Sequence, residues 1–362
     1  MNPNAKITIK DVARQAGCGV ATASRVLNNS GPASAEVREK VENAARDLGF
    51  SFSATGRALQ SSRSMTIGCL VPSLVNPVFA EAVQGIQLEL SGSGYQLLIS
   101  SSSYDGAVDN EAVATLLSKD VDGLIVTMAA PARSEPLRQA QLRGIPVSLM
   151  FHDPLDEFVT AHVDNFAAAR EVARRFAGHG HRRTGFLALR FASSDRSRNR
   201  YTGFQAECRA HGLADPVLIE LSEADANTPD KLAAILNEHG DLTAIFASND
   251  FLAIAVQKAV RLLGWRVPQD LSVVGFDGIE IGRLLEAPLA TIETEPEAIG
   301  RQAARTLLSA LQGVPLRQLP PLPFHFRDGA TLAKPRPENH DDDRGATRPP
   351  SVPSLKIKLN QG

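Results

Sequence analysis

The 362-residue sequence has few cysteines and no long apolar run. Its three cysteines, Cys18, Cys69 and Cys208, are far apart and form no Cys-x-x-Cys pair, which argues against a disulfide framework or a cysteine zinc site. A membrane-spanning helix requires about 18 or more consecutive apolar residues, and the sequence contains no such run. The N-terminal residues MNPNAKITIK also lack the apolar centre of a secretion signal. We therefore expect a protein of a reducing cytoplasm that does not enter a membrane.

Common catalytic and cofactor-binding motifs are missing as well. The sequence has no GxGxxG after its first predicted strand, no GxxxxGK[ST] and no GxSxG. His179 and His181 in the segment GHGH raise the possibility of a metal site, but they fall where a predicted helix ends before a strand. We expect no catalytic residue, no cofactor and no metal site.

The net charge is small but unevenly distributed. The whole chain carries a formal charge of -2, whereas residues 1–64 contain nine basic and five acidic side chains, a net charge of +4. By subtraction, the rest of the chain carries -6. The N-terminal segment is therefore the part of the chain with an electrostatic reason to bind nucleic acid.

That segment contains three predicted short helices. Residues 8–16 begin with a threonine followed three positions later by Asp11, a capping-box pattern, and Gly17 ends this helix. A second helix is predicted for residues 20–28, and a third for residues 34–49. Two helices joined by a glycine turn and followed by a third are typical of a helix-turn-helix domain.

The second helix has side chains suited to reading DNA. Val20 and Ala21 lie at its start, where small apolar groups can contact thymine methyl groups, and Arg25 one turn later can donate to guanine O6 and N7. Side chains suited to phosphate oxygens follow on the same helix: Thr22, Ser24 and Asn28. The alternative is an ordinary surface helix with a solvated arginine.

From Thr66 onward, apolar segments alternate with stretches of helical periodicity. This pattern predicts βαβ units and parallel sheets, and its length favours two similar lobes. The predicted strands lie in the segments TIGCLVP, YQLLIS, VDGLIVT, PVSLMF, RTGFLAL, TAIFASND and LSVVGFDG. Residues 334–362 contain five prolines and the run DDD without hydrophobic periodicity, and we expect them to form a disordered tail.

The segments TIKDVARQAG, VATASRVLN and GRALQSSRSMTIGCLVPSLVNPVF resemble the lac-repressor (LacI/GalR) family of bacterial transcription regulators. The resemblance implies a small all-α helix-turn-helix headpiece and an α/β two-lobed core resembling periplasmic sugar-binding proteins of type I. The implied divisions are a headpiece (1–51), a hinge helix or linker (52–65), the core (66–333) and the tail (334–362). It also implies that Arg25 reads bases, that Val20 and Ala21 set specificity, and that Thr8 belongs to the DNA-contacting set. Gly19 occupies the position at which the family usually has a phosphate-contacting serine.

The resemblance assigns a second DNA contact to the hinge segment SATGRALQSS, residues 53–62. In the family this segment becomes ordered on operator DNA and enters the minor groove, and Leu59 matches its apolar wedge. Gly56 replaces the usual alanine, which weakens a helix interior by roughly 1 kcal/mol. A plain flexible linker is the alternative.

Candidate ligand-binding residues follow the predicted strands, where ligands bind in open α/β sheets. The segments NPVF, RYTGF, SND and GFDG resemble the family's effector-contacting segments and place four residues in a cleft: Phe79, Arg200, Asn249 and Asp277. A carboxylate, a guanidinium, an amide and an aromatic ring suit a sugar or sugar derivative. Arg196 and Arg198 leave an acidic or phosphorylated sugar open.

The predicted function is a transcriptional regulator, most simply a repressor, controlled by a sugar-like effector. We expect a homodimer in the bacterial cytoplasm that binds a pseudo-palindromic operator in double-stranded DNA. Two rivals share parts of the pattern. A solute-binding protein would need a signal peptide in place of the headpiece, and a sugar-converting enzyme would need catalytic motifs that the sequence lacks.

Overall fold

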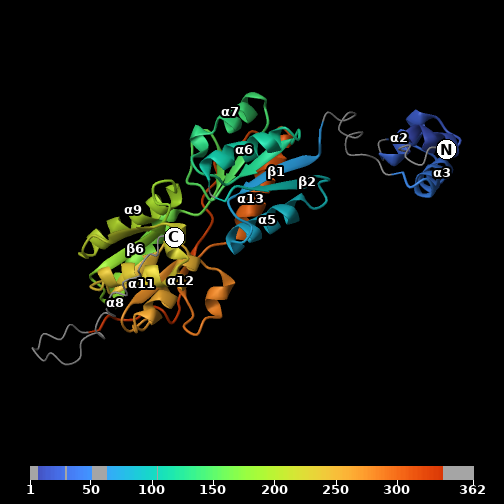
Figure 1. Ribbon diagram of the computed structural model, residues 1–362. Coiled ribbons are helices and arrows are strands. Elements are labelled where there is room, and N and C mark those ends of the chain that lie inside the picture. Colours follow the sequence, from blue (N-terminus) through green and yellow to red (C-terminus); the bar gives the residue numbers. More distant parts are fainter. Residues whose placement is uncertain (1–6, 29–30, 51–62, 104, 337–362) are drawn as a thin grey trace, which may run out of the picture. The chain divides into compact units, whose positions relative to one another are not determined.

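The computed structural model describes residues 7–28, 31–50, 63–103 and 105–336 (Figure 1). The chain divides into two compact units, an N-terminal unit of residues 1–66 and a C-terminal unit of residues 67–362. No helix in the described ranges is long and apolar enough to span a membrane.

The N-terminal unit is built from three helices, as its sequence predicts. They are α1 (Ile9–Gln15), α2 (Val20–Leu27) and α3 (Ala35–Asp47). Thr8 precedes α1, and the Asp11 carboxylate accepts hydrogen bonds from the Thr8 N–H at 3.0 Å and from its hydroxyl at 2.7 Å. Gly17 then turns the chain with a φ of 65°, a conformation that glycine adopts without steric cost. Ser34 caps α3 by accepting a hydrogen bond from the Val37 N–H.

One small hydrophobic cluster holds these helices together. Its buried members come from all three helices: Val12, Ala13, Ala23, Val26, Val41, Ala44 and Ala45. From α2, Ala23 and Val26 are buried in this cluster and Leu27 packs against it, whereas Val20, Ala21 and Arg25 remain exposed.

The C-terminal unit contains two β-sheets, each the centre of one lobe. The sheet of the first lobe has the strand order β2-β1-β3-β4-β5, and its pairs from β1 to β5 are parallel. Its strands are β1 (Thr66–Val71), β2 (Gln96–Ser101), β3 (Gly123–Val126), β4 (Val147–Met150) and β5 (Val159–Ala161). The helical segments of this lobe are α5 (Pro77–Leu90), α6 (Gly106–Leu117), η1 (Pro131–Arg133), α7 (Glu135–Leu142) and α13 (Pro296–Leu311).

The sheet of the second lobe has the order β11-β10-β9-β8-β6-β7, with only the β10–β11 pair antiparallel. Its strands are β6 (Thr184–Leu189), β7 (Val217–Leu221), β8 (Ala244–Ala247), β9 (Ser272–Asp277), β10 (Ala290–Glu293) and β11 (His325–Arg327). Its helices are α8 (Asn165–His179), α9 (Asp195–Ala210), α10 (Glu223–Ala226), α11 (Pro229–Glu238), α12 (Asp250–Leu262) and η2 (Glu280–Arg283).

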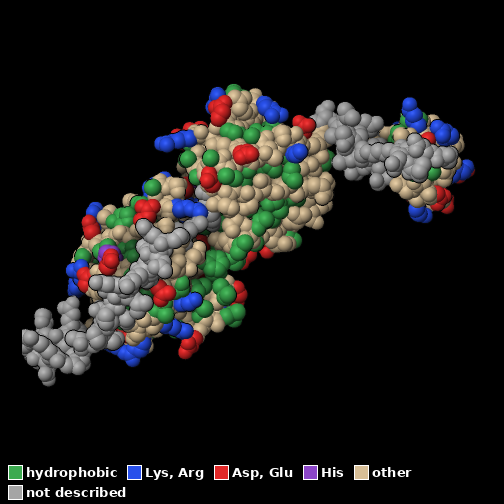
Figure 2. All heavy atoms as spheres, viewed as in Figure 1, with side chains coloured by type: hydrophobic (Ala, Val, Ile, Leu, Met, Phe, Trp, Pro, Cys, Tyr) green, Lys and Arg blue, Asp and Glu red, His purple; other side chains and the backbone are tan. Residues whose placement is uncertain are grey.

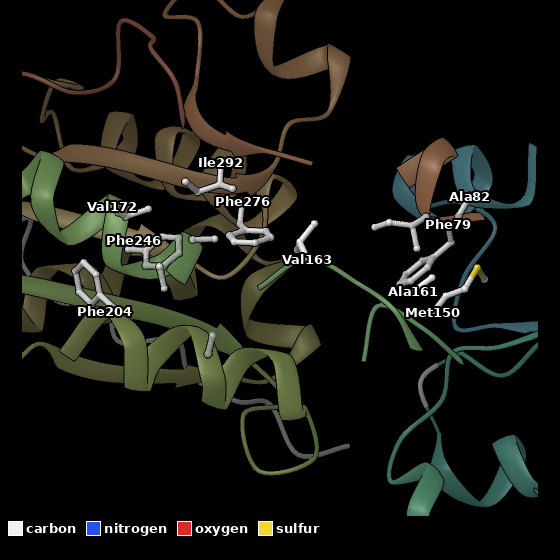
Figure 3. Packing of buried hydrophobic residues seen from close by; sticks show 14 of the residues in the cluster. Phe79, Ala82, Met150, Ala161, Val163, Val172, Phe204, Phe246, Phe276 and Ile292 are labelled. Atoms are coloured by element: carbon white, nitrogen blue, oxygen red, sulfur yellow. The ribbon is translucent and has the colours of Figure 1, made fainter. Parts of the chain in front are cut away.

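The chain passes repeatedly between the lobes, so each lobe contains distant sequence segments. It enters the second lobe after β5, returns to the first lobe with α13, and ends in the second lobe with β11. One cluster of buried hydrophobic side chains contains residues from both lobes. In Figure 3, Val163 lies between Phe79 of the first lobe and Phe276 of the second. The two lobes therefore share hydrophobic packing at their junction.

All seven predicted strand segments contain strands, and the two-lobed α/β architecture is confirmed. The sequence patterns did not single out four further strands, β5, β7, β10 and β11. β5 and β11 have three residues each, too few for a periodic pattern to be visible.

Candidate DNA-contacting helix and ligand cavity

The exposed face of α2 carries the predicted base-reading residues. Val20 is 43% exposed, and Ala21 and Arg25 are also exposed. Gly19 is the N-cap of α2 with extended backbone angles and contributes no side-chain capping bond. Figure 2 shows Lys and Arg side chains on the surface of this unit.

Arg25 has no carboxylate partner in the described part of the chain. Its Nε donates to the Ala21 carbonyl and one Nη donates to the Thr22 hydroxyl, both at a long 3.4 Å. By contrast, Lys40 of α3 pairs with Glu36 at 2.7 Å. Weak neutral contacts leave the Arg25 guanidinium able to exchange its partners for base edges at little cost.

The remaining predicted DNA contacts have local roles or lie outside the described residues. The Asn28 amide donates to the Ser24 hydroxyl at 3.3 Å, and Thr8 is engaged in the capping of α1. Leu59 and Gly56 lie outside the described residues.

A cavity of about 470 Å³ lies at the carboxyl ends of strands from both sheets. All four predicted effector residues line it: Phe79, Arg200, Asn249 and Asp277. Segments that follow β1, β3 and β4 line it from the first lobe, and segments that follow β6, β8 and β9 line it from the second. The strand ends thus bring together residues up to about 200 positions apart in the sequence, as expected for a parallel-sheet crevice.

Asp277 is the acidic group at the end of β9. Its carboxylate makes no hydrogen bond or ion pair with the described residues, and burial raises its pKa to about 6, opposed by the positive charges of Arg200 and Arg196. Its backbone φ of 117° lies in a region that few non-glycine residues adopt, although Asp and Asn adopt it more readily than most. A half-buried carboxylate without a partner is ready to accept hydrogen bonds from a ligand.

Arg200 is a buried cation held by neutral groups. Its Nε donates to the Asn165 side-chain oxygen at 2.9 Å and Nη1 donates to the Ser248 carbonyl at 2.6 Å. The guanidinium lies 3.4 Å from the centre of the Phe276 ring. Burial lowers the pKa of Arg200 to about 10, and the Asp277 charge opposes this shift. These contacts fix the guanidinium beside Asp277 and leave it charged at neutral pH.

Asn249 and Phe79 line the cavity but also have structural roles. The Asn249 side-chain oxygen caps α12 by accepting from the Leu252 N–H at 2.8 Å, so its amide nitrogen is the part left for a ligand. Phe79 is 5% exposed and packs edge-on against Phe151, with ring centres 5.3 Å apart. The two rings give one wall of the cavity an apolar surface.

Asp250, adjacent to Asn249, is a support for the site. It is fully buried, and its carboxylate accepts from the N–H groups of Gly278 and Ile279 at 2.8 Å and from the Thr291 hydroxyl at 2.5 Å. Burial and the nearby Asp277 charge raise its pKa to about 7. Asp250 therefore holds the turn that carries Asp277 and does not face the ligand space.

A pair of side chains joins the two lobes at the cavity, and sequence reasoning missed it. His152 follows β4 in the first lobe, and its Nδ1 lies 2.9 Å from Asp195 Oδ2 at the start of α9 in the second. Since His152 Nε2 accepts from the Met128 N–H at 3.2 Å, Nδ1 carries the hydrogen and donates it to Asp195. Burial acts to raise the pKa of Asp195, but His152 and Arg196 hold it well below its usual range.

The described residues contain no group of three or more His, Cys, Asp and Glu side chains arranged to hold a metal ion. His181 instead contacts the Thr243 hydroxyl at 2.9 Å and the Ala333 carbonyl at 2.8 Å, and His179 contacts the Arg175 carbonyl. His179 thus bonds within its own helix, whereas His181 joins segments that are far apart in the sequence.

Comparison with protein families matches residues 8–52 to bacterial regulatory proteins, lacI family, and residues 173–327 to the periplasmic binding protein-like domain. HTH-type transcriptional regulator GntR of Escherichia coli (strain K12) is 31% identical over 307 residues, covering 84% of this chain and 92% of that protein. The ribose operon repressor of Halalkalibacterium halodurans is 30% identical over 316 residues, covering 85% and 92%.

Among solved structures, the lac repressor dimer bound to operator and the anti-inducer ONPF matches with a TM-score of 0.82. The two chains are 25% identical, and the match covers 91% of this chain and 100% of that chain. The likeness therefore includes both the N-terminal helical unit and the two-lobed unit.

Proposed function

We propose that this chain, which belongs to the lacI family of bacterial DNA-binding transcriptional regulators, is a repressor controlled by a sugar or sugar derivative bound between its lobes. Members of this family combine a DNA-binding domain with a ligand-binding core and are regulators, not enzymes. The proposed repressor acts in the cytoplasm, as a homodimer on a pseudo-palindromic operator.

The observation that carries the effector proposal is that an unpaired carboxylate, Asp277, and a fixed guanidinium, Arg200, line the same cavity. An ionised carboxylate accepts two hydroxyl hydrogens, whereas the fixed guanidinium and the Asn249 amide donate to ligand oxygens. The Phe79 and Phe151 rings offer an apolar surface opposite these polar groups. This combination suits a polyhydroxylated molecule, and the ribose operon repressor among the relatives is consistent with such an effector.

For the DNA-binding half of the proposal, the supporting observation is the exposed face of α2. Arg25 is exposed, positively charged and weakly bonded, and Val20 and Ala21 stand beside it without bulk that would hinder approach to base edges. A single helix reads few base pairs, so two copies related by two-fold symmetry would be needed for specificity. The lac repressor structure with a similar fold is a dimer bound to operator.

Two experiments test these halves separately. Selection of binding sites from random duplexes should return a two-fold symmetric sequence, whereas a single asymmetric half-site would contradict the homodimer proposal. A thermal-shift screen against sugars, sugar acids, sugar phosphates and purines should identify the effector class, because a ligand at 100 times its Kd stabilises by about 2.7 kcal/mol. Stabilisation by purines alone would contradict a sugar effector.

A further inference from the structure

We propose that the effector is a sugar acid carrying a single negative charge, and that Arg196 binds its carboxylate. This inference rests on the proposed function, since it names the class of ligand that the cavity takes. It assigns to Arg196 the choice between acidic and neutral sugars.

Arg196 occupies the first turn of α9 and lines the cavity. The side chain is partly buried, and its Nη1 atom is fully buried without a hydrogen-bond partner among the described residues. Leaving a buried donor unpaired is costly, and more so when the group is charged. An unpaired buried guanidinium nitrogen at the wall of a cavity therefore points to a ligand that supplies the missing acceptor.

Of the other charged groups in the cavity lining, Asp277 also lacks a partner among the described residues, and one Asp109 oxygen is buried without one, whereas the rest have partners. On the acidic side, Asp195 accepts from His152, and Asp109 accepts from the Ala129 N–H at 2.7 Å through one oxygen. The other charged groups of the lining are Arg190, Arg200 and Asp277. Arg190 donates to the Ser103 carbonyl at 3.4 Å, and Arg200 is held by neutral acceptors. Asp277 suits ligand hydroxyls, which leaves Arg196 as the cation that suits an anion.

Helix geometry places Arg196 on the same face of α9 as Arg200 and on a different face from Arg198. Arg196 and Arg200 are four positions apart and share one face of α9, which faces the cavity. Arg198 lies between them on another face, is exposed, and donates to the Phe191 and Ala192 carbonyls at 3.3 and 2.6 Å. Two like charges on one helix face repel each other, and a bound anion would relieve that repulsion.

A carboxylate fits these groups better than a phosphate. It accepts two parallel hydrogen bonds from one guanidinium and adds only a single negative charge to the cavity. A phosphate dianion would bring a second negative charge into a cavity that already holds the Asp277 carboxylate and an unpaired oxygen of Asp109. The start of α9 adds partial positive charge on the same side, because Ser194 caps a helix of 16 residues there.

The test compares binding of matched compounds to the full-length protein by isothermal titration calorimetry. The panel contains hexonates and hexuronates, the hexitols and hexoses of the same configuration, and the hexose 6-phosphates. The parent protein should bind one acid at least about tenfold more tightly than its neutral counterpart. In Arg196→Gln, that acid should bind about 10- to 100-fold more weakly, whereas the neutral counterpart should bind as it does to the parent.

Two further variants test whether the loss of affinity is specific to the Arg196 guanidinium. Arg209→Gln removes the same charge from the far end of α9, where Arg209 is exposed and paired with Asp215 at 2.6 Å, and it should bind the acid like the parent. Arg196→Lys keeps the charge but loses the two-pronged donor, and its affinity should fall between those of the parent and Arg196→Gln.

The possible outcomes separate this inference from the proposed function. Equal affinity for acid and neutral sugar, or an unchanged preference in Arg196→Gln, would overturn the role of Arg196 while leaving a sugar effector in place. Tighter binding of a hexose 6-phosphate than of any acid would overturn the choice of a carboxylate. Failure of every sugar in the panel to bind would overturn both the inference and the sugar-effector proposal.

Discussion

Replacing Asp277 by asparagine should stabilise the ligand-free protein while removing its response to effector. The half-buried Asp277 carboxylate lines the cavity without a partner among the described residues, and its removal from water raises its pKa from 3.8 to about 6. An asparagine has a similar shape, carries no charge and also tolerates the positive φ at this position. The substitution therefore removes a charge that the ligand-free protein holds at a cost.

The pH dependence of this effect follows from the direction of the pKa shift. The folded protein holds the Asp277 proton more tightly than the unfolded chain does, so the stability of the parent falls as the pH rises from about 4 to about 6. Well above pH 6 the carboxyl is ionised in both the folded and the unfolded protein, so this loss of stability does not increase further. A shift of about two pKa units corresponds to at most about 3 kcal/mol, and Asp277→Asn avoids this loss.

Urea unfolding of the parent and of Asp277→Asn between pH 4 and pH 8 measures the difference directly. The two proteins should have similar free energies of unfolding at pH 4, and the variant should be increasingly more stable up to pH 6. Asp156→Asn, at an exposed site, is the control and should show no such pH-dependent difference. A variant that is less stable than the parent at pH 8, or a difference independent of pH, would refute this explanation of Asp277.

Three other substitutions test separate parts of the protein. Arg25→Ala should weaken operator binding by about 1–3 kcal/mol and relax the preference at one base pair per half-site, whereas a uniform loss across all sequences would mean that Arg25 contacts only phosphate. Leu59→Ala should weaken specific binding and reduce operator bending, with little effect on salt-dependent non-specific binding. The gel mobility of the complexes measures the bend, and an unchanged bend would contradict this prediction. Gly300→Ala should destabilise the core by about 1–3 kcal/mol or more in urea unfolding, because a Cβ there would clash with the Ala82 carbonyl of α5. Its control, Gly178→Ala, adds a methyl group with no atom within 4 Å and should not destabilise.

The sequence contains enough local information to predict most of the fold. The capping box of Thr8 and Asp11, the glycine turn at Gly17 and the apolar strand segments are all recognisable without tertiary context, because each depends on neighbours a few residues away. The three-residue strands were not recognised, since they form only by pairing with neighbouring strands of their sheets.

The candidate site was predictable in part. The four predicted effector residues follow strands or match family motifs, and all of them line one cavity. The four-residue spacing of Arg196 and Arg200 places them on one helix face that excludes Arg198, and this signal is visible in the sequence. The His152–Asp195 pair was beyond reach, because its members are 43 positions apart in different lobes and no periodic pattern connects them.

The central claim is that a ligand in the cavity controls DNA binding by the N-terminal helices. The most direct test is fluorescence anisotropy with a labelled operator obtained by selection, titrated with the parent and with Asp277→Asn in the presence and absence of the effector identified by screening. We predict that the effector changes the operator Kd of the parent by about 5- to 150-fold and leaves that of Asp277→Asn unchanged, while both proteins bind operator equally well without effector. A full effector response in Asp277→Asn, or loss of its operator binding in the absence of effector, would contradict the claim.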